Sequence, residues 1–190
     1  MKTILRPAIM LFTLLTIVTG VLYPLAVTGL SQLLFKDEAN GSLVTVSGNA
    51  VGSKLIGQQF TSPDHFWGRL SATGPYPYNA AVSSGSNYGP LNPALTDAVT
   101  ARVDALKAVD SGNEQPVPVD LVTASGSGLD PDISLAAAYY QAARVARYRN
   151  ISKERVEALI EQHAERPWLG IIGEPRVNVL AVNLGLDGLR

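Results

Sequence analysis

The 190-residue chain contains no cysteine. This absence excludes a disulfide, a thiolate metal site and an anchor built on a lipid-modified cysteine. Charge is also scarce, because Asp, Glu, Lys and Arg make up only 16% of the residues and the formal net charge is −1. Proteins that bind nucleic acid usually carry a basic patch, so this balance argues against a nucleic-acid partner.

Charged residues are missing altogether between Pro7 and Phe35. An α-helix rises about 1.5 Å per residue, so this stretch exceeds the roughly 30 Å of the hydrocarbon core. Its many Leu, Ile, Phe and Val residues each favour insertion by about 0.3 to 0.6 kcal/mol. We therefore expect a transmembrane helix over residues 7–34.

Two other interpretations of this stretch are less favoured. A cleaved signal peptide has a shorter apolar core, of roughly 7–15 residues, and a small-residue cleavage site that is missing here. A buried helix of a soluble protein is disfavoured because the rest of the chain offers nothing to surround so long an apolar element. Lys2 and Arg6 precede the stretch, and the positive-inside rule then places residues 1–6 in the cytoplasm and residues 35–190 outside it.

The apolar stretch also contains residues that a plain anchor does not need. Thr13, Thr16 and Gly20 are spaced to share one helix face and would let another helix approach closely. Pro24 removes one backbone hydrogen bond and favours a kink near Gly20. We predict packing against partner helices through Thr13, Thr16, Gly20, Tyr23 and Pro24. The alternative is that Gly and Pro are simply common in membrane helices.

Residues 35–190 have the pattern of one mixed domain of the α+β class. The pattern predicts strands at 43–46, 50–56 and 117–122, and a late strand or helix start at 177–182. Helices are expected from Pro93 to just before Ser111, over 135–149 and over 152–164, with Asn92, Ser134 and Ser152 as N-caps. Residues 73–93 form a long loop rich in Gly, Pro, Asn and Ser that also carries three tyrosines.

The sequence contains no motif that identifies an active site. The segment TASGSG at 123–128 could hold a phosphate group with backbone N–H groups, but it lacks the lysine of a P-loop and is favoured as an ordinary turn. His65 and His163 have no metal-ligand spacing and are expected at the surface or half-buried. Asp130 and Asp132 are interpreted as helix caps rather than cation ligands.

Two further possibilities concern the remaining polar residues. Serines are plentiful, but no G-x-S-x-G motif is present, so an anchored hydrolase would need a Ser-His-Asp cluster formed by the fold. Arg144, Arg147 and Arg149 end one predicted helix, where cations suit the helix dipole. They either meet an acidic partner surface or form a solvated face.

The chain as a whole resembles the KdpC family, the C subunits of the bacterial potassium-importing P-type ATPase complex KdpFABC. The resemblance is carried by short segments in the same order along nearly the whole chain: Arg6–Pro7, 19–24, 39–43, 52–58, 66–69, 78–79, 84–87, 92–93, 117–146, 177–180 and 183–187. The one departure is Leu70, where the family usually has proline, and it affects only local loop geometry.

The resemblance implies a non-catalytic accessory subunit that needs no cofactor and sits in the bacterial inner membrane. Its partners would be a KdpA-like channel subunit, a KdpB-like P-type ATPase subunit that hydrolyses ATP, and a small KdpF-like subunit. The family has also been viewed as a nucleotide-binding catalytic chaperone. For that alternative, the candidate nucleotide-binding residues are Ser125, Gly126, Ser127, Gly128 and Gln141.

Overall fold

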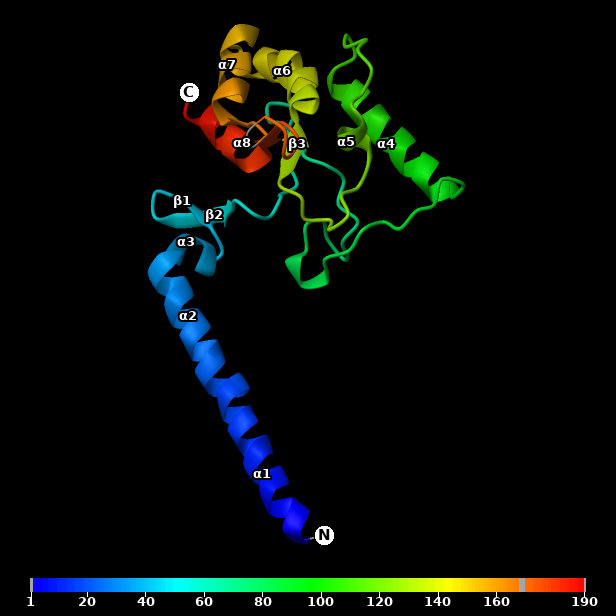
Figure 1. The fold of residues 1–190 in the computed structure, drawn as a ribbon. Coiled ribbons are helices and arrows are strands. Elements are labelled where there is room, and N and C mark those ends of the chain that lie inside the picture. Colours follow the sequence, from blue (N-terminus) through cyan, green and yellow to red (C-terminus); the bar gives the residue numbers. More distant parts are fainter. Residues whose placement is uncertain (1, 168–169, 190) are drawn as a thin grey trace. The chain divides into compact units, whose positions relative to one another are not determined.

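The computed structural model describes residues 2–167 and 170–189, and the chain divides into two compact units, Met1–Leu43 and Val44–Arg190. Figure 1 shows the first unit as a run of helices and the second as a mixture of helices, short strands and loops. The prediction of a mixed domain behind one N-terminal apolar helix is confirmed.

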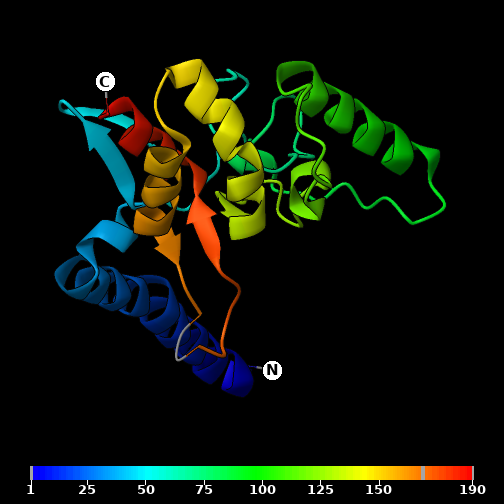
Figure 2. The same ribbon diagram turned by 90° about the horizontal axis from the view of Figure 1, so that it is seen from above.

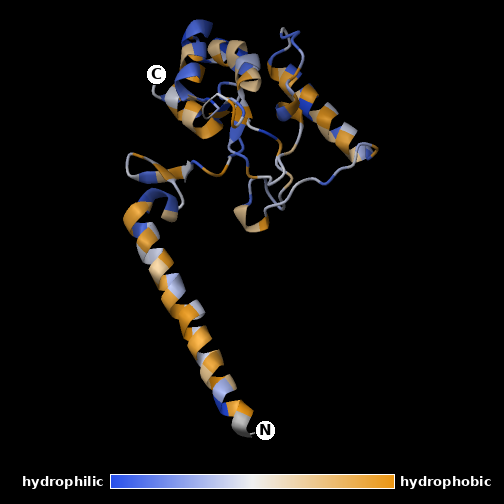
Figure 3. Cartoon of the chain, viewed as in Figure 1, coloured by the Kyte–Doolittle hydropathy of each residue, from blue (hydrophilic) through white to orange (hydrophobic). Residues whose placement is uncertain are grey.

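The first unit is a continuous helical rod. It consists of α1 (Lys2–Ile17), a π-helical turn (Val18–Leu22) and α2 (Tyr23–Leu34), followed by the short α3 (Lys36–Ala39). The most apolar 18-residue stretch within Ile4–Leu34 has a mean hydropathy of 2.1, and none of that stretch is buried inside the chain. Apolar residues predominate along the rod (Figure 3), and it is long and apolar enough to cross a membrane.

The π-helical turn lies immediately before Pro24. The N–H of Tyr23 donates to the carbonyl of Val18, five residues earlier, and Pro24 has no N–H to donate to Gly20. An i→i+5 bond encloses one more residue than an α-helical turn, so residues after the turn are rotated relative to an uninterrupted helix. The disturbance predicted around Gly20 therefore takes the form of a π turn, and the kink itself stays a prediction.

The second unit begins with the predicted hairpin. Strand β1 (Leu43–Val46) pairs with β2 (Asn49–Ser53). The two residues between them, Ser47 and Gly48, both have positive φ, at 51° and 81°. Two consecutive positive φ values define the type I′ turn, whose twist matches that of the flanking strands.

The core of the second unit is a small antiparallel sheet packed against three helices. The strand order is β3 (Asp132–Ser134), β5 (Arg176–Asn178) and β4 (Ala164–Glu165), with Ile133 opposite Val177. Helix α6 (Leu135–Arg149) packs on α7 (Lys153–His163), and α7 packs on α8 (Val179–Asp187), as Figure 2 shows. The sheet itself was not predicted, because strands of two or three residues are too short for alternation to be visible.

The remaining elements are α4 (Pro93–Val109), α5 (Val119–Val122) and a 3₁₀ turn (Ala80–Val82). The predicted strand at 117–122 is wrong. Pro116 and Pro118 have no N–H to donate to a ladder, and the Asp120 carboxylate accepts hydrogen bonds from the N–H and the hydroxyl of Ser134. The chain therefore forms one helical turn there.

The predicted helix starts agree with the structure. The side chains of Asn92, Ser134 and Ser152 accept the N-terminal N–H groups of α4, α6 and α7. The ambiguous stretch 177–182 is divided at Asn178, where the strand ends and the side chain caps α8 by accepting the N–H of Ala181. Asp130 and Asp132 are not helix caps, because Ser134 fills that role and the two carboxylates pair with Arg69 and Arg176.

Candidate functional site

The membrane-helix candidates fall on both sides of the π turn. Thr13 and Thr16 lie in α1, Gly20 lies within the turn, and Tyr23 and Pro24 begin α2. All five are exposed within the chain. A Cβ atom added at Gly20 would meet nothing within 4 Å, so this glycine is not required by the fold of its own chain.

The nucleotide candidates form two separate groups. Ser125–Gly128 lie in the loop between α5 and β3, so they do not open a helix. The N–H of Ser125 donates to Leu70, and the N–H of Gly128 donates to Ser125. The carbonyl of Ser127 accepts from the N–H of Ser84. The loop thus joins the segments around residues 70 and 84 by backbone hydrogen bonds.

Gln141 lies in the core and not beside a ligand cavity. It is 1% exposed, its Oε1 accepts the N–H of Trp67, and its Nε2 donates to the carbonyls of Trp67 and Ala137. This use of the amide supports a structural role. Nucleotide binding through Ser125–Gly128 and Gln141 stays a prediction that nothing here tests.

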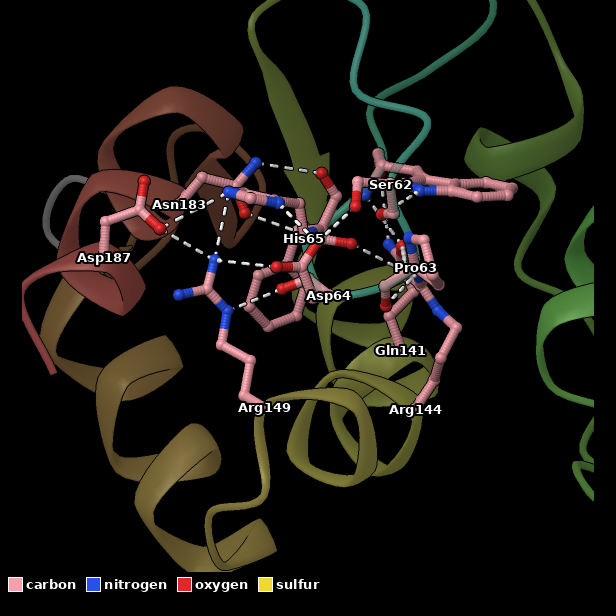
Figure 4. A network of polar contacts seen from close by, with 11 residues as sticks. Ser62, Pro63, Asp64, His65, Gln141, Arg144, Arg149, Asn183 and Asp187 are labelled. Atoms are coloured by element: carbon pink, nitrogen blue, oxygen red, sulfur yellow. Dashed lines mark hydrogen bonds and ion pairs between the residues drawn. The ribbon is translucent and has the colours of Figure 1, made fainter. Parts of the chain in front are cut away.

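Asn183 of α8 holds the adjacent residue in the same way. Its Oδ1 accepts the N–H of Phe66 at 2.8 Å, and its Nδ2 donates to the carbonyl of Phe66 at 3.0 Å. Gln141 and Asn183 therefore satisfy the backbone of two consecutive buried residues, as a neighbouring strand would (Figure 4). The structure places the side chains of Phe66 and Trp67 in the core.

Two arginines of α6 fix the segment just before these residues. The Nη1 and Nη2 atoms of Arg144 donate to the carbonyls of Pro63 and His65, and the Nε atom of Arg149 donates to the carbonyl of Asp64. Arg144 is 1% exposed. The interpretation of these arginines as a solvated or partner-facing surface is therefore wrong for Arg144 and Arg149. Arg147 does face solvent and pairs with Asp110.

We call the segment 62–67, together with Gln141, Arg144, Arg149, Asn183 and Asp187, the anchored loop (Figure 4). Within it, Asp64 has the clearest electrostatic perturbation. The hydroxyl of Ser62 donates to its carboxylate, and His65 and Arg149 lie nearby, which lowers the pKa of Asp64 from 3.8 to about 2 although partial burial opposes the shift. Asp64 is therefore ionised at neutral pH, and its Oδ1 atom contacts both Ser62 and His65.

The anchored loop contains Ser, Asp and His, but their order does not support a hydrolase. In a catalytic triad the serine bonds to histidine, which is oriented by the carboxylate. Here Ser62 and His65 both contact Oδ1 of Asp64, and the Nε2 atom of His65 lies 3.0 Å from Arg149. The serine contacts the acid in place of a base, so this cluster lacks an activated nucleophile.

The histidines are placed as expected. The His65 side chain is half-buried, and Nδ1 of the half-buried His163 lies 2.9 Å from the carbonyl of Leu159. Among residues 2–167 and 170–189, no group of three or more His, Asp or Glu side chains is placed to hold a metal ion.

Sequence reasoning missed most of the anchored loop. Asn183 and Arg149 carried no pattern that indicated buried contacts, and the polar residues of α6 fitted an exposed face equally well. Gln141 was singled out only through the family resemblance, and for a different role. These contacts could be identified only from the fold, because the hydrogen bonds join residues that are 74 to 117 positions apart in the sequence.

Comparison with known proteins agrees with this architecture along the whole chain. The family model described as "KdpC: K+-transporting ATPase, c chain" matches residues 5–188. A "Potassium-transporting ATPase KdpC subunit" of Polaromonas naphthalenivorans is 65% identical over 190 residues, covering 100% of this chain and 97% of the relative.

Proteins with the same name give similar matches. The one from Variovorax paradoxus is 63% identical over 187 residues, which cover 98% of this chain and 97% of the relative. The one from Herpetosiphon aurantiacus is 59% identical over 190 residues, which cover 100% of this chain and 98% of the relative. With both the apolar helix and the folded unit inside these matches, the chain belongs to the KdpC family of potassium-transporting ATPase subunits.

Proposed function

We propose that the chain is a non-catalytic accessory subunit that assembles with, and stabilises, the channel-like and P-type ATPase subunits of a bacterial potassium import complex. Residues 1–6 lie in the cytoplasm, the apolar rod crosses the inner membrane once, and the second unit lies outside. A small KdpF-like subunit completes the assembly, and ATP hydrolysis belongs to the P-type subunit.

The observation that carries this proposal is the exposure of the apolar rod. Between Ile4 and Leu34 no side chain is buried in its own chain, although this stretch includes more than a dozen large apolar residues. Such a surface is stable only against lipid or other membrane helices. The hydroxyl of Thr19 donates to the carbonyl of Leu15 at 2.7 Å, so this polar group is satisfied without water.

The second unit supports an accessory role. Its buried polar groups, above all Gln141, Arg144 and Asn183, bond to the backbone of their own chain. Groups that are engaged in this way hold a rigid shape and leave no free base beside a nucleophile. A rigid body attached to a membrane helix is what a stabilising subunit requires.

The proposed orientation can be tested because the chain has no cysteine. A single cysteine at Thr3→Cys or at Gln115→Cys can be labelled in intact cells with a membrane-impermeant maleimide. Gln115 lies in an exposed loop of the second unit. We expect labelling of Gln115→Cys and no labelling of Thr3→Cys before lysis. The opposite pattern would overturn the proposed topology.

Assembly through the rod can be tested at Gly20. The Cβ atom that Gly20→Leu adds would meet nothing within 4 Å in its own chain, so we expect the effect of the substitution to report on partners. We expect it to reduce co-purification of the partner subunits at least severalfold, because a bulky side chain prevents close approach of helices.

Gly29→Leu is the matched control for this test. It makes the same chemical change in the same rod and also meets nothing within 4 Å. Gly29 is flanked one turn away on each side by Leu25 and Leu33, so it does not belong to a groove of small residues. Recovery of the Gly20→Leu complex at the level of the control would remove the packing role of Gly20.

A further inference from the structure

Positive charge accumulates around Trp67 beyond what the chain neutralises. The guanidinium groups of Arg102 and Arg144 both lie over the Trp67 ring, with Cζ 5.0 and 4.9 Å from its centroid. Cation–π contacts of this kind stabilise a cation without cancelling its charge. In the described part of the chain, neither arginine forms an ion pair with a carboxylate, whereas neighbouring Arg69 pairs with Asp130 at 3.0 Å.

A cavity of about 100 Å³ opens beside Arg69 and Arg102. Its wall comes from residues 58–61, residues 68–71, the Pro77–Tyr78 turn and Arg102 of α4. The described residues that line it include two arginines and no Asp or Glu. The cavity is therefore a region of positive potential with low-dielectric walls, which concentrates anions.

Both arginines retain hydrogen-bond donors that their own chain does not use. Arg102 donates from Nε to the carbonyl of Leu121 and from Nη2 to the carbonyl of Gly68, and its Nη1 has no partner among the described residues. Arg69 donates from Nη1 and Nη2, while its buried Nε has no partner there. A bound oxyanion would supply an acceptor for the unused Nη1 donor of Arg102, whose residue lines the cavity.

From this combination we infer that the cavity walled by Arg69 and Arg102 is a binding site for a single oxyanion, either one carboxylate or one phosphate group. Arginine's planar fork matches both groups in geometry. Burial lowers the pKa of Arg102, so removing its charge from water is costly and a bound anion would offset that cost.

The volume limits what can bind. A cavity needs about 10–15 Å³ to hold one water molecule, so 100 Å³ accommodates several waters or one small oxyanion. Pockets for drug-sized ligands are about 300–1,000 Å³, which excludes a whole nucleotide here. The oxyanion can come from solution as an inorganic ion, or from an Asp or Glu side chain of a partner subunit. This inference goes beyond the proposed function, because the cavity belongs to the chain whether or not partners bind.

The test places a competing carboxylate at the mouth of the cavity. Gln59 and Thr61 line the cavity and are exposed, so Gln59→Glu and Thr61→Glu each add a negative charge without disturbing buried contacts. Gln115→Glu makes the same change as Gln59→Glu at an exposed position that does not line this cavity. Circular dichroism of the full-length variants in detergent checks that they fold alike.

In the first arm, inorganic phosphate and acetate are titrated into the purified full-length chain by calorimetry, with chloride keeping the ionic strength constant. We expect saturable binding of one anion, weakened at least tenfold in Gln59→Glu and Thr61→Glu and unchanged in Gln115→Glu. This pattern identifies a free oxyanion as the ligand. Tenfold corresponds to about 1.4 kcal/mol.

In the second arm, each variant is co-purified with its partner subunits. Loss of partner recovery in Gln59→Glu and Thr61→Glu only, with elution of wild-type partners by phosphate, identifies a partner carboxylate. The inference is overturned if the wild type binds neither anion and both variants recover partners normally, or if Gln115→Glu behaves like Gln59→Glu. Because the first arm needs no partner, its result is separable from the Gly20→Leu test of assembly.

Discussion

The hydrogen bonds from Asn183 to Phe66 give a prediction whose size can be worked out from the structure. Asn183→Ala removes the acceptor for the N–H of Phe66 and the donor for its carbonyl, and both groups belong to a fully buried residue. Each unsatisfied buried polar group costs about 1–3 kcal/mol, so the two together should lower the free energy of unfolding by about 2–5 kcal/mol. The side-chain amide is 1% exposed, so no water reaches it from the surface.

A loss of this size should be measurable by thermal unfolding. For a domain of about 150 residues, 1 kcal/mol lowers Tm by roughly 2–4 °C, so we expect a decrease of at least about 4 °C. The control is Asn49→Ala, which makes the same change at an exposed position of β2 and should stay within about 0.5 kcal/mol of the wild type. If Asn183→Ala costs no more than this control, the reasoning that the amide replaces a neighbouring strand is refuted.

Three other changes test neighbouring contacts. Gln141→Leu should lower the free energy of unfolding by about 2–5 kcal/mol, measured in urea without any nucleotide, because the backbone N–H and carbonyl of Trp67 both lose their partner. Unchanged stability with loss of ATP binding would instead support the nucleotide alternative. The pKa of Asp64 is about 2 in the folded chain, below its ordinary 3.8. The stability that this carboxylate contributes is therefore present above about pH 4 and is lost as the pH falls towards 2. Asp64→Asn should flatten the curve of Tm against pH in that range. Gly57→Ala should lower the free energy of unfolding by about 1–3 kcal/mol, because the new Cβ would lie 2.3 Å from the Tyr78 ring and 2.6 Å from the carbonyl oxygen of Asp130. Its control is Gly112→Ala, where the new Cβ meets nothing within 4 Å. Equal stability of the two variants would contradict the packing argument.

Most helices could be predicted from local chemistry, and the short strands could not. The N-caps at Asn92, Ser134 and Ser152 and the apolar periodicity that follows them are signals within a few residues. The strands β3, β4 and β5 have two or three residues each. The pairing of β3 with β5 joins residues more than 40 positions apart, and the pairing of β4 with β5 joins residues 11 to 13 positions apart. At 117–122 the β-branched residues suggested a strand, but Pro118 and the contact from Asp120 to Ser134 outweighed that propensity.

The same distinction applies to the candidate sites. Thr13, Thr16 and Gly20 could be predicted as packing residues from the sequence, because small residues are conspicuous among large ones in an apolar helix, and their packing role stays a prediction. The cavity beside Arg69 and Arg102 was not found, because its walls come from four separate segments and neither arginine belongs to a sequence pattern that indicates anion binding. Buried arginine is rare, and periodicity gives no reason to expect it, so the inward direction of Arg144 and Arg149 could only come from the fold.

The anchored loop and the oxyanion cavity are consecutive parts of one segment. Gln141 and Asn183 fix the backbone at Phe66 and Trp67, and the next residues, Gly68 and Arg69, form a wall of the cavity. Ordering the backbone of each residue costs roughly 1–2 kcal/mol, and a chain without cysteine must meet that cost with non-covalent contacts. Side-chain amides and arginines supply such contacts by bonding directly to backbone groups at many points along residues 62–69. The bonds from α6 and α8 hold the backbone at Phe66 and Trp67, whereas the Arg69 side chain is held by Asp130 and Ala124. The position of these groups therefore depends on contacts from distant segments more than on the loop's own sequence.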